Sequence, residues 1–390
     1  MKKLVVVAFV LAVTGAFVGV RSVLGTTTEA PATDRQTRAV VDSATKFLKS
    51  LNANQRQQVE FAFTPQKFGT NAPFHRTPDG GVAAGAPAGP TKGGPGMGPP
   101  GGFVGERYGL AVWSNYPVSD VPRPGLRLGS LTNTQRAAAM HLLQTVLSPM
   151  GYQKVLDVMG SDQALTDAGT NFASGEAVYT IGIFGKPSIS TPWMLEFGGH
   201  HLGLNIVIAA PGGSMTPTLT GAQPSIYKRG DKTVRVLAQE NDTAFALLDA
   251  LNETQRRQAI LNYQVGDLVL GPGQAGKQIA PEGLKASQLN DAQKALLLNV
   301  ISRWANIVND VYANPRIAEI KSDLNNTYFA WSGPTTHEPG KNGSSYYRIQ
   351  GPRLVIEFSP QGVGGDPTMH VHTIYRDPTN DYGVKLTGSQ

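Results

Sequence analysis

Residues 42–57 read DSATKFLKSLNANQRQ and residues 242–257 read DTAFALLDALNETQRR, so one pattern occurs twice at an offset of 200 residues. A shorter form occurs twice more, as LTNTQRAAA at 131–139 and LNDAQKALL at 289–297. In every copy a Leu and then Asn or Thr precede a Gln that lies three residues further on. This spacing is typical of a capping box at the start of a helix. We therefore predict that four helices begin directly after Asn52, Thr132, Asn252 and Asn290.

The capping box has a simple physical basis. The side chain of the capping residue accepts a hydrogen bond from the amide three residues later, and the Gln side chain accepts one from the amide of the capping residue. The preceding Leu supplies an apolar contact that directs the chain into the helix. Apolar residues at helical spacing, such as Ala295, Leu298 and Ile301, then give the last helix one buried face. The predicted Gln partners are Gln55, Gln135, Gln255 and Gln293.

The predicted strands repeat more weakly than the helices, but in the same order. Each copy has an aromatic-led segment ending in glycine, then a β-branched and leucine-rich segment, then a segment that begins with methionine. The matching pairs are 193–198 with 346–351, 201–209 with 354–358, and 215–224 with 369–378. We therefore predict an α+β fold, in which a duplicated helix–helix–strands unit forms one pseudo-two-fold body with an antiparallel sheet.

This repeat sets the expected domain organisation. Residues 38–390 are predicted to form a single duplicated domain, with copy one at 38–235 and copy two at 236–390. The copies differ by an insertion at 64–108, which contains DGGVAAGAPAGPTKGGPGMGPPGG at 79–102. A segment so rich in Gly and Pro buries too little apolar surface to offset the entropy of ordering it. We predict that the insertion is disordered.

The N-terminus has the pattern of an export signal. Lys2 and Lys3 precede an apolar run from Leu4 to Val20, and Ala30-Pro31-Ala32 offers a cleavage site. Residues 1–32 are therefore interpreted as a signal peptide or an N-terminal membrane anchor, and the length of the run leaves both open. We expect an exported protein that is periplasmic, secreted or N-terminally anchored. Any contact with a membrane would then be through this segment.

Composition excludes nucleic acid as the expected partner. The formal charge is +6, but its positive residues are scattered and include Lys2, Lys3 and Arg21 of the N-terminal segment. The aromatic residues do not alternate with basic ones, as a nucleic-acid groove requires. The chain contains no cysteine, so thiolate cannot serve as nucleophile or metal ligand. The expected partner is a small-molecule ligand whose identity the sequence does not indicate.

Two histidine clusters, His200-His201 and His370-Val371-His372, are the main candidates for chemistry. Residues two apart on a strand share a face, so His370 and His372 would project together. Imidazole nitrogens are common ligands of zinc and copper. The alternative is that these histidines are polar residues with a structural role.

Of the first cluster, His201 is the better candidate ligand. Neighbours on a strand point to opposite faces, so His201 would share a face with Asn205 and His200 would point away. A bulge at Gly198-Gly199 would reverse this arrangement, so His200 stays as a fourth, weaker metal candidate. If His201, His370 and His372 bind one ion, their ligand nitrogens should lie within about 4–5 Å of a common point.

Polar residues after the second cluster supply further candidates. Asp377 and Asp381, in the segment DPTNDYG at 377–383, are candidates for a general base or for orienting a histidine. The alternative for them is turn formation together with an ion pair to Arg376. Asn205 and Arg376 are the candidate ligand-binding residues.

Several sequence blocks resemble a known family. Two blocks, each of which contains one histidine cluster, are similar to blocks of domain-of-unknown-function family 3500: WMLEFGGHHLGLN at 193–205 and HVHTIYRDPTNDYG at 370–383. The resemblance implies a bacterial, often exported protein, and it implies no activity. The Gly/Pro-rich insertion departs from the family pattern but lies outside these blocks. The other similar blocks are RLGSLT at 127–132, TLTGAQP at 218–224, FAWSGP at 329–334 and YYRIQGP at 346–352.

Two classes of function follow from these observations. The first is an exported metal-dependent protein, with hydrolase as its expected activity, in which three histidines hold zinc or copper and leave a position open to water. The second is a non-catalytic exported ligand-binding or surface-associated protein with a histidine-lined pocket. Whether the protein is an enzyme stays open at this point.

Overall fold

The computed structural model describes residues 32–72, 105–170, 175–209, 212–338, 341–362 and 365–388. The chain divides into two units, Met1–Pro31 and Ala32–Gln390, and the described residues all belong to the second. The predicted signal or anchor therefore lies outside them, apart from Ala32. No helix within the described residues is long and apolar enough to cross a membrane.

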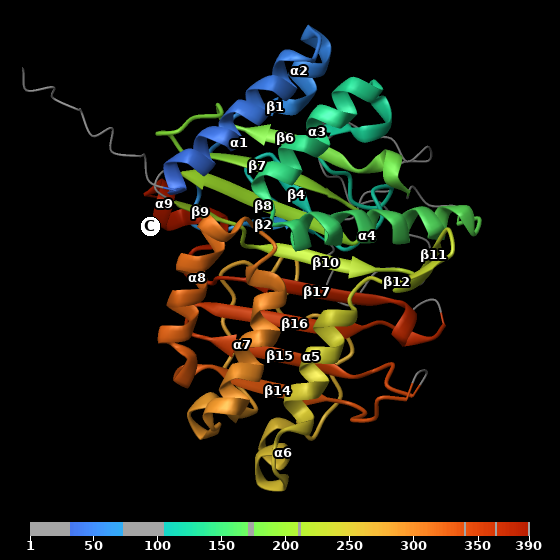
Figure 1. Ribbon diagram of the computed structural model, residues 1–390, viewed down its shortest axis with the longest axis vertical. Coiled ribbons are helices and arrows are strands. Elements are labelled where there is room, and N and C mark those ends of the chain that lie inside the picture. Colours follow the sequence, from blue (N-terminus) through green and yellow to red (C-terminus); the bar gives the residue numbers. More distant parts are fainter. Residues whose placement is uncertain are drawn as a thin grey trace, which may run out of the picture. The chain divides into compact units, whose positions relative to one another are not determined.

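A large sheet forms the centre of the second unit (Figure 1). Within the described residues its strand order is β1-β6-β7-β8-β10-β17-β16-β15-β14-β13, so that strands of the N-terminal half occupy one side and strands of the C-terminal half the other. These strands are β1 (Glu60–Phe61), β6 (Thr180–Phe184), β7 (Trp193–Gly199), β8 (Leu202–Ala209), β10 (Thr218–Ala222), β13 (Leu284–Lys285), β14 (Tyr328–Ser332), β15 (Tyr346–Gly351), β16 (Leu354–Pro360) and β17 (Val371–Arg376).

The sheet is mixed, which corrects the prediction of an antiparallel sheet. β1 runs parallel to β6, whereas the pairs from β6 to β13 are antiparallel. β1 follows a helix directly and reaches β6 only after the long chain segment between them, so no tight hairpin constrains its direction. Shorter strands, β5 (Leu126–Arg127) and β9 (Gly212–Ser214), pair with β6 and β8.

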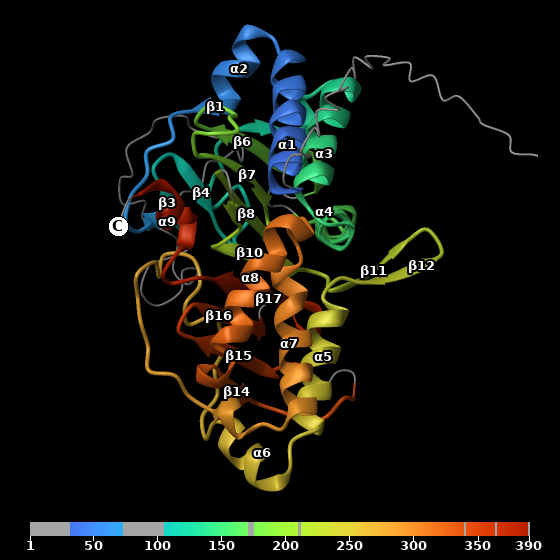
Figure 2. The same cartoon turned by 60° about the vertical axis from the view of Figure 1, so that its left-hand side comes forward.

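Helices cover one face of this sheet (Figure 2). All four predicted capping boxes are present, with both reciprocal hydrogen bonds, at the starts of α2, α3, α6 and α7. The helices of the N-terminal half are α1 (Ala32–Lys49), α2 (Ala53–Val59), α3 (Asn133–Val146) and α4 (Pro149–Asp167). Those that follow are α5 (Ala238–Asp249), α6 (Glu253–Ala259), α7 (Asp291–Ala305) and α8 (Asp310–Ser322). The short α9 (Val384–Thr387) lies beside β3 (Gly105–Tyr108) on the other face of the sheet (Figure 2).

The capping glutamines also join helices that are distant in sequence. Gln55 Nε2 donates to Gln135 Oε1 at 3.1 Å, and Gln255 Nε2 donates to Gln293 Oε1 at 3.1 Å. Gln135 additionally donates to a carbonyl at the end of α1, and Gln293 to one at the end of α5. The same glutamine pair thus joins α2 to α3 in one half and α6 to α7 in the other, in addition to capping the individual helices.

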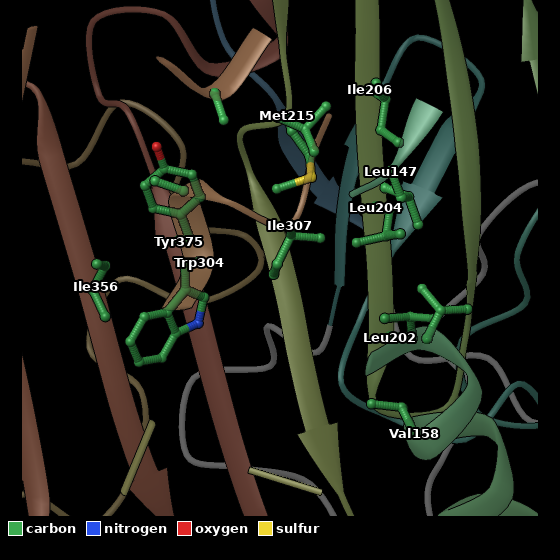
Figure 3. Packing of buried hydrophobic residues seen from close by; sticks show 14 of the residues in the cluster. Leu147, Val158, Leu202, Leu204, Ile206, Met215, Trp304, Ile307, Ile356 and Tyr375 are labelled. Carbon is green, nitrogen blue, oxygen red and sulfur yellow. The ribbon is translucent and has the colours of Figure 1, made fainter. Parts of the chain in front are cut away.

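The main hydrophobic core lies between the sheet and the helices and contains residues of both halves. Figure 3 shows part of it, with Leu202, Leu204 and Ile206 along β8 and Trp304 beside Ile356 and Tyr375. Because strand residues alternate between faces, Val207 of β8 points to a second, smaller apolar cluster on the other face. The sheet is therefore apolar on both sides, so buried polar side chains within it need particular partners.

The predicted disordered insertion at 64–108 is partly ordered. β2 (Thr70–Ala72) and β3 (Gly105–Tyr108) lie inside this range and form a small sheet with β4 (Ala111–Trp113). The flanks order because they bury Ala72 and Tyr108 and place the carboxylate of Glu106 against Arg376. The glycine-rich centre of the insertion, at 79–102, lies outside the described residues.

Candidate metal centre

Three histidines from different parts of the sequence converge at one end of the central strands β8, β10 and β17. His201, His370 and His372 each offer one ring nitrogen, and these three atoms lie within 4.8 Å of one another. Nε2 of His370 is 3.0 Å from Nε2 of His201 and 3.0 Å from Nε2 of His372. This meets the distance expected for a common ion, so the triad can hold a metal ion.

The topology of the central strands brings the triad together. β10 pairs with β8 on one side and β17 on the other, and His372 lies opposite Gly221 of β10. His370 directly precedes β17, so it and His372 project together as the spacing of two residues predicts. His201 lies in the turn that joins β7 to β8, and its carbonyl accepts a hydrogen bond from the amide of Gly221.

The predicted placement of His200 and His201 on a strand is wrong. Gly199 pairs with Leu202, so the two histidines are the central residues of a two-residue hairpin turn. His201 has a φ of 60°, a left-handed conformation that is uncommon for residues other than glycine. Such strain persists where the surroundings enforce it and often marks a functional site. Here it turns the His201 ring toward the other two histidines.

Gly221 provides the space for this ring. A Cβ atom at position 221 would lie 2.7 Å from the carbonyl oxygen of Val371 and 3.1 Å from Cδ2 of His201. Backbone on one side and the imidazole on the other leave no room for a side chain. A glycine is therefore required at this point of β10 if His201 is to contact the histidines of β17.

His201 is held in the state that metal ions bind. Burial, together with the neighbouring His200, His370 and His372, lowers the pKa of His201 well below its usual value. A neutral imidazole has a lone pair to offer, whereas a protonated one has none. His201 is 1% exposed and His372 6%, while His370 is half-buried, so solvent reaches the centre on the side of His370.

Hydrogen bonding among the three rings does not by itself explain their arrangement. Each Nε2 carries either one hydrogen or one lone pair, so that of His370 can serve only one of its two neighbours at 3.0 Å. Zinc bonds of 2.0–2.1 Å in tetrahedral geometry would place ligand nitrogens about 3.3 Å apart. A cation that accepts all three lone pairs would therefore satisfy the whole group once His201 and His372, whose ligand nitrogens lie within 4.8 Å of each other, adjust to this spacing.

Two side chains that the sequence analysis missed orient His372. Its Nδ1 is 3.1 Å from the amide of Asn115 and 3.6 Å from Oδ1 of Asp267. A carboxylate beside Nδ1 favours a hydrogen on that atom and leaves Nε2 free to bind a metal, whereas the Asn115 Nδ2 group, a donor, favours a lone pair on Nδ1. Although partial burial raises the pKa of Asp267, hydrogen bonding and charge from His372 lower it below its ordinary value. Asp267 therefore stays ionised and suited to this role.

The loop that contains Asn115 is fixed by a buried arginine. Arg123 is 1% exposed and donates to the carbonyls of Ser114 at 2.7 Å and Gly199 at 3.0 Å. These bonds tie the loop to the end of β7, next to the turn that carries His201. Burial lowers the pKa of Arg123 to about 10, which keeps it charged at neutral pH. No local sequence pattern signals such a loop, because its partners are distant along the chain.

His200 has a different partner from the triad. Its Nδ1 is 2.7 Å from Oδ1 of Asp162 on α4, and its ring stacks on His201 with centroids 3.7 Å apart. Its carbonyl accepts a hydrogen bond from the hydroxyl of Tyr179 at 2.6 Å. The convergent group within the described residues does not include it. His200 thus supports the turn and the ring of His201 from behind.

The structure does not bring Asp377 or Asp381 to the histidines. Both follow the far end of β17, and His372 is about 13 Å from Arg376 at the strand rise of about 3.3 Å per residue. Asp377 pairs with Arg316 at 2.9 Å and Asp381 with Arg376 at 2.8 Å. The turn and ion-pair alternative therefore describes these residues better than the role of a base in the metal centre.

The two candidate ligand-binding residues are also separate from the triad. Arg376 is 3% exposed and binds the buried carboxylate of Glu106 as well as Asp381. Asn205 is fully buried, four residues along β8 from His201, and donates to the carbonyl of Pro217 at 2.9 Å. Strand alternation placed Asn205 on the face of His201, but the hairpin turn removes His201 from that register. Asn205 thus belongs to the strand interior.

Comparison with known proteins identifies the family without adding an activity. The model of the family described as protein of unknown function (DUF3500) matches residues 106–384. No curated protein and no solved structure gives a significant match. The match covers more than half of the chain and includes the triad, Asn115 and Asp267. The chain therefore belongs to the DUF3500 family.

Proposed function

We propose that this protein binds one zinc or copper ion through His201, His370 and His372. The observation that carries the proposal is the convergence of three Nε2 or Nδ1 atoms within 4.8 Å of one another, two of the contacts being 3.0 Å. Imidazole ligands suit both Zn²⁺ and Cu²⁺, and carboxylates are absent from the convergent group in the described residues. Magnesium and calcium, which prefer oxygen ligands, fit the site less well.

The chemistry that fits this centre best is metal-dependent hydrolysis. Catalytic zinc sites use three protein ligands and keep the fourth position for water, whose pKa the ion lowers to about 7. The half-buried side of His370 is where water and substrate would approach. Asp267, whose carboxylate lies 3.6 Å from Nδ1 of His372, would raise the basicity of that ligand. In this proposal Asp267 takes over the orienting role first considered for Asp377 and Asp381.

Metal analysis of the purified full-length chain tests the binding proposal. After incubation with excess Zn²⁺ or Cu²⁺ and dialysis, the wild-type protein should retain about one ion per chain, and the His370→Ala/His372→Ala variant should retain none. His141→Ala, which removes an exposed histidine remote in sequence from the triad, is the matched control and should retain the ion. Protein that stays metal-free would favour the non-catalytic ligand-binding alternative.

Hydrolysis requires a second test. A panel of chromogenic carboxyl and phosphate esters would be assayed with metal-loaded protein, metal-free protein and the double histidine variant. The proposal predicts turnover that appears on loading and disappears in the variant. Turnover that is equal in all three samples would assign the activity to something other than this centre. Loaded protein inert toward every ester would leave metal binding without hydrolysis.

The proposed duplication has further support in matching details of the two halves. Both halves have capping boxes joined by glutamine pairs, and the main sheet runs β6-β7-β8-β10 in one half and β14-β15-β16-β17 in the other. The histidines do not correspond between copies, because His201 follows β7 whereas His370 and His372 lie at the start of β17. Two related units with one asymmetric centre per chain therefore remain our proposal.

Export also remains part of the proposal. Its support is the basic and apolar sequence at the N-terminus, which lies outside the described residues. Expression with residues 1–32 present and then deleted, followed by fractionation, tests it. Deletion should retain the protein in the cytoplasm. N-terminal sequencing of the exported form would distinguish a cleaved signal beginning near residue 33 from an uncleaved anchor.

A further inference from the structure

A second candidate site lies at the opposite end of β17 from the histidines. Three segments enclose a cavity of about 310 Å³: the loop at 67–69, the loop at 275–276 and the C-terminal segment 378–385. Ligand pockets in proteins typically have volumes of about 300–1,000 Å³. The cavity is thus large enough for a small organic molecule, and no step of the proposed metal chemistry uses it.

The walls of the cavity are mainly apolar. Phe68 is 46% exposed, which is unusual for a side chain of this size, and it faces the cavity together with Ala275, Pro378 and Val384. Gly276 has a φ of 74°, and a Cβ atom there would lie 3.1 Å from the Phe68 ring. Glycine at this position therefore allows the loop to pass close to the ring. An apolar ligand would cover the exposed face of Phe68 and gain the corresponding burial energy.

The charge available in the cavity is positive. Lys67 and Lys385 line it, both are exposed, and neither ammonium is ion-paired with a carboxylate in the described part of the chain. Lys67 Nζ lies 5.8 Å from the centre of the Phe68 ring, and Lys385 Nζ donates to Thr379 Oγ1 at 2.8 Å. Asp381, the acidic residue in the lining, is already bonded to Arg376 and to the amide of Asp377. An incoming anion would therefore meet two lysine ammonium groups and one carboxylate, that of Asp381, whose charge is already paired with Arg376.

We infer that this cavity binds a small organic anion with an apolar body, such as a medium-chain carboxylate. The carboxylate would bind Lys67 and Lys385, and the alkyl chain would pack against Phe68, Ala275 and Val384. The inference stands on this cavity alone and does not depend on the metal proposal.

Isothermal titration of the full-length protein with octanoate tests this inference. We expect saturable binding of octanoate and no binding of octyltrimethylammonium, which has the same chain length and the opposite charge. Lys67→Glu/Lys385→Glu should weaken octanoate binding at least tenfold, because it replaces the two positive charges that would bind the carboxylate by negative ones. Both lysines are exposed, so the core of the variant stays intact. Lys277→Glu removes an exposed positive charge close to the cavity but outside its lining, and should leave the affinity within about twofold.

A second variant tests the apolar part of the inference. Ala275→Trp places a large side chain into the cavity from its wall and should abolish octanoate binding, while the melting temperature stays close to that of the wild type. Octanoate that fails to bind the wild-type protein would overturn the inference. So would binding that all the variants retain, or equal binding of octyltrimethylammonium. Because metal content is measured separately, these outcomes are independent of the proposed function.

Discussion

The two ends of β17 carry buried polar clusters of opposite character. At the start of the strand, three histidines face one another, and burial keeps the pKa of His201 well below its usual value. At its end, Arg376 binds Glu106 and Asp381, and Tyr382 donates to Glu106 at 2.5 Å. In the cluster around Arg376 the charged groups pair with one another, which is expected of a structural element. The histidine triad has more convergent nitrogen atoms than hydrogen bonding among the rings can satisfy. This difference makes the histidine triad the better candidate for a functional site.

The largest effect on stability is expected when the positive charge of Arg376 is removed from its cluster with Glu106 and Asp381. Arg376→Met should lower the free energy of unfolding by about 3–5 kcal/mol, because it leaves Glu106 buried without its partner. Denaturant unfolding measures the loss. The double variant Arg376→Met/Glu106→Gln should recover part of it. A loss below about 1 kcal/mol would show that the cluster is not a structural ion pair, and the comparison would fail.

Part of this arrangement could be predicted from sequence because it depends on local geometry. Capping boxes need residues three apart, and the pairing of His370 with His372 needs residues two apart on a strand, so both were predicted correctly. The association of His201 with the other two histidines was inferred from residue type and from a strand alternation that the turn at His200 and His201 removes. It could have failed, because it depends on β10 lying between β8 and β17.

The remaining features could not be predicted because they depend on distant partners. The prediction treated His201 as a strand residue, whereas the turn at His200 and His201 is set by the pairing of Gly199 with Leu202. Asn115 and Asp267 reach His372 from loops 257 and 105 residues away in sequence. Asp377 and Asp381 were near His372 in sequence, but an extended strand separates them from it.

The next effect concerns the histidine triad. His372→Ala should weaken binding of Zn²⁺ by about 100-fold or more, which corresponds to about 3 kcal/mol, because one of three ligands is lost. Competition with a chelating indicator measures the affinity. In contrast to Arg376→Met, this variant should unfold at nearly the same denaturant concentration as metal-free wild type. A large loss of stability without loss of metal would reverse the roles we assign to the two clusters.

A smaller effect is expected behind His372. Asp267→Asn keeps the size of the side chain and removes its charge, and should reduce metal affinity about 10–100-fold. Asp366→Asn, at an exposed carboxylate just before the histidine strand, is the matched control and should have little effect. Equal affinities of wild type and Asp267→Asn would show that the carboxylate does not orient the ligand.

The smallest effect is a pH dependence of stability that arises from Asp381 in the cluster around Arg376. Burial, opposed by Arg376, raises the pKa of Asp381 to about 6 from an ordinary value of 3.8. A carboxyl whose pKa is raised in the folded state binds protons that the unfolded chain has released, so its contribution to stability is lost as pH rises from about 4 to 6. The stability of the wild type relative to Asp381→Asn should therefore fall by roughly 1–2 kcal/mol over this window. Unfolding curves that stay parallel across it would contradict the prediction.

The central claim is that three imidazoles hold one metal ion, and X-ray absorption spectroscopy of the zinc-loaded protein tests it directly. We predict a first shell of about four light atoms near 2.0 Å, with the outer-shell scattering of three imidazole rings and one further oxygen or nitrogen. His370→Ala/His372→Ala, which should retain no zinc, should give no such spectrum. A wild-type spectrum with one imidazole or none, or with six oxygen neighbours, would contradict the account.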